Sequence, residues 1–326
     1  MKSTSKAARA VVAAIGIAVA SAPAFAQSAQ KYPHKPIRIV TASAASQTDI
    51  VTRLIGIKMS ETFGQPVVIE NRAGAGGAIG ANIVAKATPD GYTLLLQSGQ
   101  FAIRAAIQAN LPYDSIKDFA GVTQVGFSTQ ALVVSPSLGV KAVKDLIAFA
   151  QARPEQLLFS SAGAGTGTHM DTERFRFATG IKARHVAFKA TSEAMIEVVA
   201  GRTHFAAVPL GPALSLIKEG KLTALAVFTP KRSLSLPDTP AMAEVVPGYQ
   251  RDGSYGLLAP VGTPRAIRQQ LAQEVARIVT LPDVLERMRI MGFVPATSTP
   301  EEHDKIVRSE IETFIKVAKL VGLRTP

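Results

Sequence analysis

Short runs of β-branched and aliphatic residues alternate with longer helical patterns along most of this 326-residue chain, and this alternation limits the possible folds more than any other feature. Strands and helices of these lengths, taken in turn, are typical of layered α/β folds in which helices cover mostly parallel sheets. The sequence therefore predicts an α/β protein with mostly parallel sheets.

The predicted elements form two similar series. The first contains strands at 37–41, 67–70, 93–97, 122–127 and 131–135, with helices at 48–63 and 79–86. The second contains strands at 157–161, 183–186, 205–208 and 222–228, with helices at 143–153, 168–179, 192–200 and 212–219. A proline-rich connection at 230–247 leads to a strand at 255–259 and to helices at 264–279, 282–291 and 300–321, each with proline in its first turn.

The repetition of this pattern suggests two α/β lobes, which agrees with the number of domains expected for a chain of this length. If the C-terminal helices return to the first lobe, two chain crossings form a hinge. The cleft between the lobes then becomes the natural binding site.

The first 26 residues have the composition of a secretory signal peptide. A basic segment with three Lys and Arg residues precedes an apolar run at 11–20, and Ala24-Phe25-Ala26 has the pattern of a cleavage site. The apolar run is too short to span a bilayer stably, although an uncleaved anchor is the alternative. We expect cleavage after Ala26, a mature chain that starts near Gln27, and a periplasmic location.

The composition limits the classes of ligand that this protein is expected to bind. The formal net charge is +12, but the Lys and Arg residues are scattered and Trp is absent, so neither a basic stripe nor a base-stacking surface for nucleic acid is evident. An anionic small ligand suits the basic balance better. The chain has no Cys, which excludes disulfides and Cys-bound metals.

Two loops have the composition of binding loops. The first loop, residues 41–49, and the second loop, residues 160–169, each join a predicted strand to a predicted helix and consist of small residues and hydroxyls. Small side chains let a ligand approach the backbone closely, and the free N–H groups of a helix start attract anions. Two such loops, one in each lobe, could hold a carboxylate between them; ordinary helix caps and tight turns are the alternative.

Sequence signatures of enzymes and cofactor sites are missing. The glycines of 74–80 are spaced G-x-G-G-x-x-G and are separated from the preceding strand, unlike a dinucleotide fingerprint. No G-x-S-x-G elbow occurs, and the five His residues lack metal-ligand spacing. A catalytic pair of Ser161 and His169 can be imagined, although a His that packs at a helix start is the favoured interpretation. Arg184 and Lys189 could add positive potential near a ligand. We expect no enzyme activity, no cofactor and no metal.

The motifs resemble those of one family. The segments are YPHKPIRIV at 32–40, GQPVVIENRAGAGG at 64–77, ATPDGYTLL at 87–95, LPYD at 111–114, KDF at 117–119, GTGTH at 165–169, GKLTALAV at 220–227 and GLLAP at 256–260. In this combination the chain resembles the Bug-type substrate-binding receptors of tripartite tricarboxylate transporters, over nearly all of its mature length.

This resemblance implies a two-lobed type 2 periplasmic-binding-protein fold. Lobe 1 would comprise 27–130 plus 251–326, and lobe 2 would comprise 131–250. It also implies a monomer that binds a small carboxylate between its lobes and delivers it to membrane transport subunits. The ligand-binding residues that it implies are Ser43, Ala44, Ala45, Ser46, Gln47, Thr48, Asp49, Ser98, Gly99, Ser161, Ala164, Gly165, Thr166, Gly167, Thr168, His169, Val208 and Pro209.

Two departures from the family pattern bear on the ligand. The family usually has Pro-Pro-Gly-Gly in the first loop, where this chain has Ala44-Ala45-Ser46-Gln47. An Asp-Asn pair is frequent after the strand at 205–208, where this chain has Val208-Pro209-Leu210. An ammonium group would lack a carboxylate partner there. We therefore expect a carboxylate ligand without an amino group, with an apolar or aromatic body as one option.

The expected function is capture of a small organic carboxylate by lobe closure. Two alternatives remain at this point. One is an orphan receptor that signals to a sensor protein, and the other is a secreted hydrolase that uses Ser161 or Ser98.

Overall fold

The structure is a computed structural model, and it describes residues 32–42, 46–249 and 254–323. The signal peptide expected at 1–26 lies outside the described residues. So do three positions of the first loop that were expected to bind ligand: Ser43, Ala44 and Ala45.

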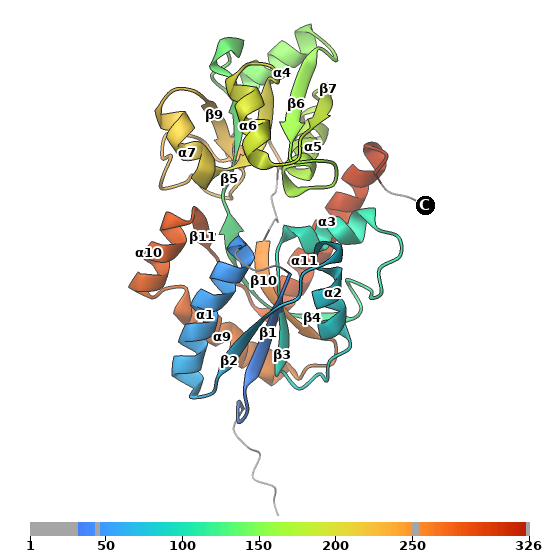
Figure 1. The fold of residues 1–326 in the computed structure, drawn as a ribbon, viewed down its shortest axis with the longest axis vertical. Coiled ribbons are helices and arrows are strands. Elements are labelled where there is room, and N and C mark those ends of the chain that lie inside the picture. The colour runs from blue at the N-terminus through green and yellow to red at the C-terminus, as the bar shows by residue number, and fades with distance from the viewer. Residues whose placement is uncertain (1–31, 43–45, 250–253, 324–326) are drawn as a thin grey trace, which may run out of the picture. The chain divides into compact units, whose positions relative to one another are not determined.

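The first sheet has six strands in the order β11-β4-β10-β3-β1-β2 (Figure 1). Its strands are β1 (Ile37–Thr41), β2 (Val67–Asn71), β3 (Thr93–Gln97), β4 (Phe119–Ser128), β10 (Ser254–Pro260) and β11 (Phe293–Pro295). β1 pairs in parallel with β2 and β3, whereas β10 is antiparallel to both of its neighbours, β3 and β4. We refer to this sheet and the helices packed on it as lobe 1.

The second sheet has five strands in the order β7-β6-β8-β5-β9. Its strands are β5 (Gln130–Val134), β6 (Leu157–Ser161), β7 (Ala183–Ala187), β8 (Phe205–Pro209) and β9 (Thr223–Val227). β6 is parallel to β7 and β8, and β5 is antiparallel to β8 and β9. We refer to this sheet and its helices as lobe 2.

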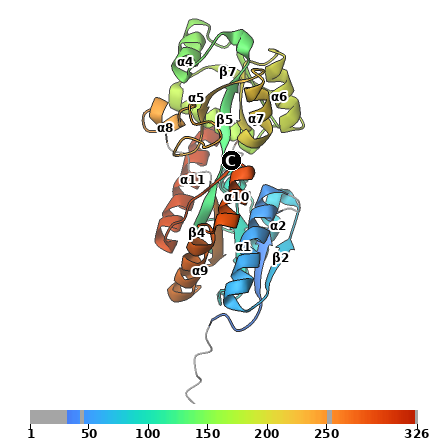
Figure 2. The same ribbon diagram turned by 90° about the vertical axis from the view of Figure 1, so that its left-hand side faces the viewer.

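Helices bury the faces of both sheets (Figure 2). In lobe 1 they are α1 (Gln47–Phe63), α2 (Ala78–Ala85), α3 (Gly99–Ile107), α9 (Arg265–Ile278), α10 (Pro282–Ile290) and α11 (Pro300–Leu320). In lobe 2 they are α4 (Val143–Ala152), α5 (Gly167–Thr179), α6 (Thr191–Val199), α7 (Leu210–Lys218) and α8 (Met242–Val245). α2, α3 and α11 share one apolar core with β1, β3 and β10, and α11 also contacts α5 of lobe 2.

Strand alternation explains the core of lobe 2. Leu132 and Val134 of β5 pack with α4 and α5, while Ala131 and Val133 pack with α6 and α7. Successive side chains of a strand point to opposite faces, so a sheet that is covered on both faces needs an uninterrupted apolar run. The prediction of an α/β protein is confirmed.

The prediction of mostly parallel sheets is wrong, because both sheets are mixed. Two of the antiparallel members are strands that arrive from the other lobe: β5 follows β4 after a single residue, and β10 returns after lobe 2, whereas β11 is a short edge strand that follows α10 and pairs antiparallel with β4. Such a strand enters its sheet against the direction set by the local strand–helix units. No short-range pattern encodes that direction.

Other differences concern short elements. The sequence prediction omitted α3, β11, α8 and two short 3-10 turns, at Ala75–Gly77 and Pro136–Leu138. Pro264 is the residue before α9 and not part of its first turn, whereas Pro282 and Pro300 do occupy first turns. No helix of the described residues has the length and apolar character needed to cross a bilayer.

α11 begins with a reciprocal cap that gives a first prediction. The Thr299 hydroxyl accepts a hydrogen bond from the Glu302 N–H at 3.2 Å, and the Glu302 carboxylate accepts one from the Thr299 N–H at 2.8 Å. Thr299→Ala should lower the free energy of unfolding by about 1 kcal/mol, measured by urea denaturation. Glu302→Gln keeps an acceptor oxygen and should lower the free energy of unfolding by only a few tenths of a kcal/mol. An unchanged free energy of unfolding in Thr299→Ala would contradict the prediction.

Candidate functional site

The carboxyl ends of β1 and β3 lie at one edge of the first sheet. These strands are parallel neighbours, and α1 and α3 begin directly after them. β10 starts at the same edge, because it is antiparallel to β3 and pairs Gly256 with Gln97. Ligands of open α/β sheets bind outside such an edge. The first loop and the α3 start therefore share this edge.

Buried polar groups without partners gather here. Within the described residues, the Thr41 hydroxyl, both polar atoms of the Gln97 amide and the Ser254 hydroxyl form no hydrogen bond. They end β1, end β3 and begin β10, respectively. Buried polar groups are normally satisfied, so a cluster of unsatisfied ones at one edge marks a place for a ligand or water. The sequence analysis missed all three, although polar residues at the ends of apolar strands are a readable signal.

The first loop ends in a capped helix start with free donors. The Ser46 hydroxyl accepts a hydrogen bond from the Asp49 N–H at 3.2 Å. In the part of the chain that the structure describes, the N–H groups of Gln47 and Thr48 form no hydrogen bond. They lie at the positive end of the helix dipole, where an anion is favoured.

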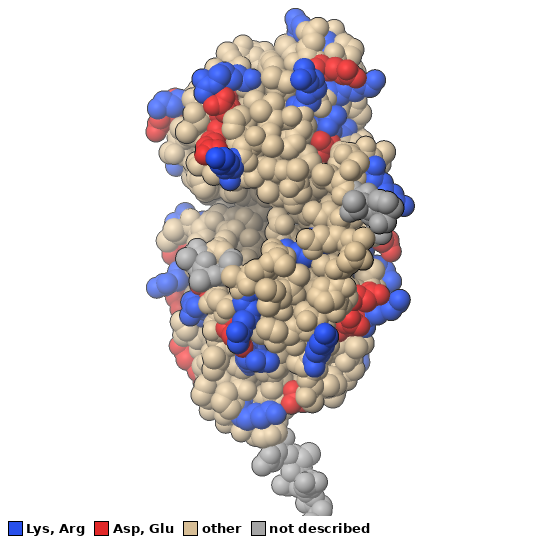
Figure 3. Space-filling model, turned by 45° about the vertical axis from the view of Figure 1, so that its right-hand side comes forward, with Lys and Arg blue, Asp and Glu red and all other residues tan. Residues whose placement is uncertain are grey.

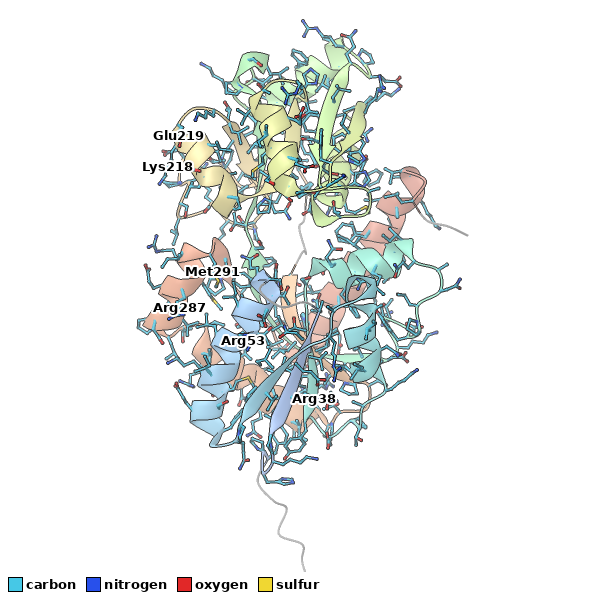
Figure 4. All side chains as sticks on the ribbon, viewed as in Figure 1. Arg38, Arg53, Lys218, Glu219, Arg287 and Met291 are labelled. Atoms are coloured by element: carbon cyan, nitrogen blue, oxygen red, sulfur yellow. The ribbon has the colours of Figure 1, made fainter. Side chains whose placement is uncertain are left out.

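The side chains of Gln47 and Asp49 have structural contacts instead. The Gln47 amide donates to the Met291 carbonyl and accepts from the Tyr255 hydroxyl, both at 3.1 Å. Met291 lies at the end of α10 (Figure 4). The buried Asp49 carboxylate accepts from the Asn71 amide at 2.9 Å and lies 3.0 Å from the Arg53 guanidinium. These two predicted site residues fix the start of α1.

The hydroxyls of the second loop brace the loop itself. The Thr166 hydroxyl donates to the Gly163 carbonyl at 2.7 Å, and the Thr168 hydroxyl accepts from the Ala162 N–H at 3.0 Å. The fully buried Ser161 hydroxyl accepts from the Gly163 N–H at 3.1 Å. The loop is therefore held in shape before any ligand arrives.

The backbone of the second loop keeps hydrogen-bond donors that are available to a ligand. Among described residues, the N–H groups of Ala164, Gly167 and Thr168 form no hydrogen bond, while the His169 N–H is capped by Thr166. The start of α5 thus repeats the start of α1: the third N–H is capped and the first two are open. This arrangement is suited to an anion.

A catalytic pair of Ser161 and His169 is not formed. Ser161 instead pairs with His185, whose Nε2 lies 2.6 Å from the hydroxyl oxygen. His169 stacks on the His185 ring, with ring centroids 4.0 Å apart, and its Nδ1 accepts from the Gly165 N–H at 3.2 Å. Burial, helped by the neighbouring His185 and then by the positive charge of Arg176, lowers the pKa of His169 to about 4, so this ring is neutral and packs at the helix start.

Helix α3 links the two loops. A methyl group placed on Gly167 would lie 3.4 Å from Nε2 of Gln100, and one placed on Gly165 would lie 2.9 Å from Cδ1 of Ile107. The second loop therefore rests against α3, whose start adjoins the first loop at the sheet edge. The surface is hollowed between the two lobes, and the visible wall of the hollow is mostly uncharged (Figure 3).

Four further predicted residues lie at the start of α3 and at the end of β8. Ser98 and Gly99, partly exposed, form the start of α3, and the Ser98 hydroxyl makes no capping bond. Pro209 is partly exposed at the end of β8. Val208 is fully buried in the apolar core with α6 and α7, so its side chain cannot contact a ligand.

Solved structures resemble this one closely. Rhodopseudomonas palustris Rpa4515 with adipate is 33% identical, with a TM-score of 0.69 and coverage of 89% of this chain and 98% of that chain. MatC from Rhodopseudomonas palustris with bound malate is 28% identical, with a TM-score of 0.65 and coverage of 88% and 99%. The predicted periplasmic-binding-protein fold is thereby confirmed.

The sequence comparisons agree. BugT of Bordetella pertussis is 32% identical over 319 residues, which cover 96% of this chain and 98% of that protein. The model of the tripartite tricarboxylate transporter family receptor matches residues 51–323. The chain belongs to this family of Bug-type solute-binding receptors.

Proposed function

We propose that this receptor binds a small organic carboxylate between the starts of α1 and α5. The observation that carries the proposal is the repeated geometry of these helices, each with a capped third N–H and two open N–H groups. Carboxylate oxygens are the natural acceptors for such donors. The adipate and malate bound to the two structural relatives support the same ligand class.

Binding would draw on further groups at the sheet edge. Thr41, Gln97 and Ser254 offer neutral donors and acceptors that the protein leaves unused within its described residues. Closure of the lobes removes water and strengthens each hydrogen bond to the ligand. We propose that the receptor, as a periplasmic monomer after cleavage behind Ala26, delivers its ligand to membrane transport subunits.

We propose binding without catalysis. The Ser161 hydroxyl is fully buried and engaged with His185 and Gly163, so a substrate cannot reach it. Ser98 forms no hydrogen bond with a histidine or a carboxylate in the described part of the chain. A nucleophilic serine needs both access and an adjacent base.

The proposed ligand lacks an amino group. Of the carboxylates near the helix starts, Asp49 is bonded to Asn71 and paired with Arg53, and Glu173 is paired with Arg176. A ligand ammonium group would be desolvated without a free partner. A glutamate affinity equal to that of the corresponding dicarboxylate would refute this part of the proposal.

A thermal-shift screen of the mature protein tests the proposal directly. The panel contains adipate, malate, succinate, citrate, benzoate and glutamate. A ligand at about one hundred times its Kd should stabilise the protein by roughly 2.7 kcal/mol, which is readily seen in the melting temperature. The absence of a shift with every acid, repeated on protein that has been unfolded and refolded to remove carried ligand, would overturn the proposal.

The cap of α5 gives a matched pair of variants. Thr166→Val removes the hydroxyl that binds the Gly163 carbonyl and caps the His169 N–H, so the open donors lose their fixed positions. Affinity for the tightest acid of the panel should fall roughly tenfold in calorimetric titration. Thr179→Val makes the same chemical change at the far end of α5, where the hydroxyl bonds to the Phe175 carbonyl, and should leave affinity unchanged. Equal affinity losses in both variants would contradict the assigned role of Thr166.

A further inference from the structure

Arg104 carries a buried positive charge that forms no ion pair within the described part of the chain. Arg104 lies on α3 and is only 7% exposed. No aspartate or glutamate of the described residues lies within ion-pair distance of its guanidinium. Buried arginines are normally paired, because an isolated buried charge is costly. Its neighbouring polar group is the Tyr113 hydroxyl, which stays neutral because burial raises the pKa of Tyr113, although the Arg104 charge offsets part of that rise.

The guanidinium faces a backbone loop at the site. A methyl group placed on Gly76 would lie 2.5 Å from Nη2 of Arg104, and one placed on Gly77 would lie 3.4 Å from Nη1. The same group on Gly77 would lie 2.8 Å from Cβ of Ala42, which belongs to the first loop. The two nitrogens therefore lie beside the glycine turn at 75–77, next to the first loop, and not at the carbonyl end of α3.

The face of α3 that carries Arg104 also meets the second loop. Gln100, Arg104 and Ile107 are spaced by four and three residues, so they share one face of the helix. Gln100 and Ile107 are the residues that contact the second loop, at Gly167 and Gly165. Long side chains on a helix point back toward its N-terminus, which for Arg104 is the site edge. Arg104 is thus placed where the first loop, the second loop and α3 meet.

We propose that Arg104 forms an ion pair with a carboxylate of the bound ligand, an inference that rests on the proposed function. The open N–H groups of α1 and α5 offer hydrogen bonds and partial charge, and Arg104 adds a full positive charge. Its planar donors match the two oxygens of a carboxylate. The absence of side chains at Gly76 and Gly77 lets the guanidinium pack directly against the glycine turn.

The test compares three arginine variants by calorimetric titration with every acid of the panel that binds the wild-type protein. Arg104→Gln should weaken binding tenfold to a hundredfold, as expected for loss of a hydrogen-bonded charge. Arg104→Lys keeps the charge without the planar pair of donors and should fall in between. Arg287→Gln is the control, because it changes net charge equally at an exposed position on α10 (Figure 4) and should not alter affinity.

A second readout separates ligand pairing from a structural role. The wild-type protein should prefer adipate to its neutral diamide, adipamide, and Arg104→Gln should reduce that preference tenfold or more. A purely structural role would weaken both ligands alike and leave their ratio unchanged. The ligand-free Arg104→Gln protein should melt no lower than the wild type, because the variant removes an uncompensated buried charge.

The outcomes are distinct. If the wild type binds acids of the panel and Arg104→Gln binds them within twofold, or with unchanged preference over the amide, the inference is overturned and the proposed function stands. If the wild type binds no acid of the panel, the proposed function fails and the inference fails with it.

Discussion

Replacement of Gly256 by alanine is expected to lower the free energy of unfolding by about 3 kcal/mol, near the upper end of the usual cost of overpacking. Gly256 lies in the middle of the first sheet, on β10, and the ring of His303 from α11 packs directly on it. An added methyl group would overlap with Cε1 and Nε2 of that ring and would lie 3.1 Å from the Thr123 carbonyl oxygen. Neither the ring, which is fully buried, nor the paired backbone can move away freely.

A double-mutant cycle identifies the cause. In a His303→Ala background the ring is gone, so Gly256→Ala should cost much less than it does in the wild type. The coupling between the two changes, measured from urea denaturation curves, should amount to about 2 kcal/mol and favour the double variant. Additive effects would mean that the cost comes from the β10 backbone and not from the ring.

The second large effect is a loss of stability in acid. His303 is completely buried, and neither ring nitrogen has a hydrogen-bond partner among the described residues. Burial lowers its pKa from 6.5 to about 3. Between these two pH values the unfolded chain binds a proton that the folded protein excludes. The contribution of neutral His303 to the free energy of unfolding is therefore fully present above pH 6.5 and is lost progressively as the pH decreases toward 3. The loss for this residue is about 1.4 kcal/mol per pH unit, or roughly 2 kcal/mol between pH 6.5 and 5.

The variant His303→Leu isolates that contribution. His169, whose pKa is also lowered, adds to the acid sensitivity of both proteins, whereas Glu173, whose pKa is raised by burial, opposes it. The difference between wild type and variant therefore reports on His303 alone. The free energy of unfolding, measured by urea denaturation from pH 7.5 to 4.5, should depend less steeply on pH in the variant. The difference in slope should approach the roughly 1.4 kcal/mol per pH unit that corresponds to one proton. Parallel curves would show that His303 is protonated in the folded protein or is unimportant for acid stability.

The sequence predicted best what local patterns encode. The strands that became β1, β3 and β6 are short runs rich in β-branched and aliphatic residues, and the structure places all three as predicted. α3 was missed because it is only nine residues long and starts with Gly99, a poor helix former, directly after a strand. The strand order could not be predicted, since it depends on pairings such as β10 with β3 that join distant segments.

At the candidate site, too, locally encoded features could be predicted and features that depend on distant contacts could not. Both loops could be found from their small residues and their position before helices, because helix starts are locally encoded. The roles of their hydroxyls could not, since Ser161, Thr166 and Thr168 turn inward to brace the second loop. Positive charge was sought at Arg184 and Lys189, which are exposed. Arg104 became a candidate only when folding brought α3, Gly76 and Gly77 together.

The central place of β10 has a consequence for biosynthesis. β3 and β4 are joined through β10, which the ribosome makes only after the whole of lobe 2. Until then β3 has one open edge, and β4 has no partner at all in its sheet. Open edges of this kind invite pairing between chains. A nascent chain of this protein thus cannot complete lobe 1 in N-to-C order, and a chain that terminates before β10 should aggregate rather than persist as a half-built receptor.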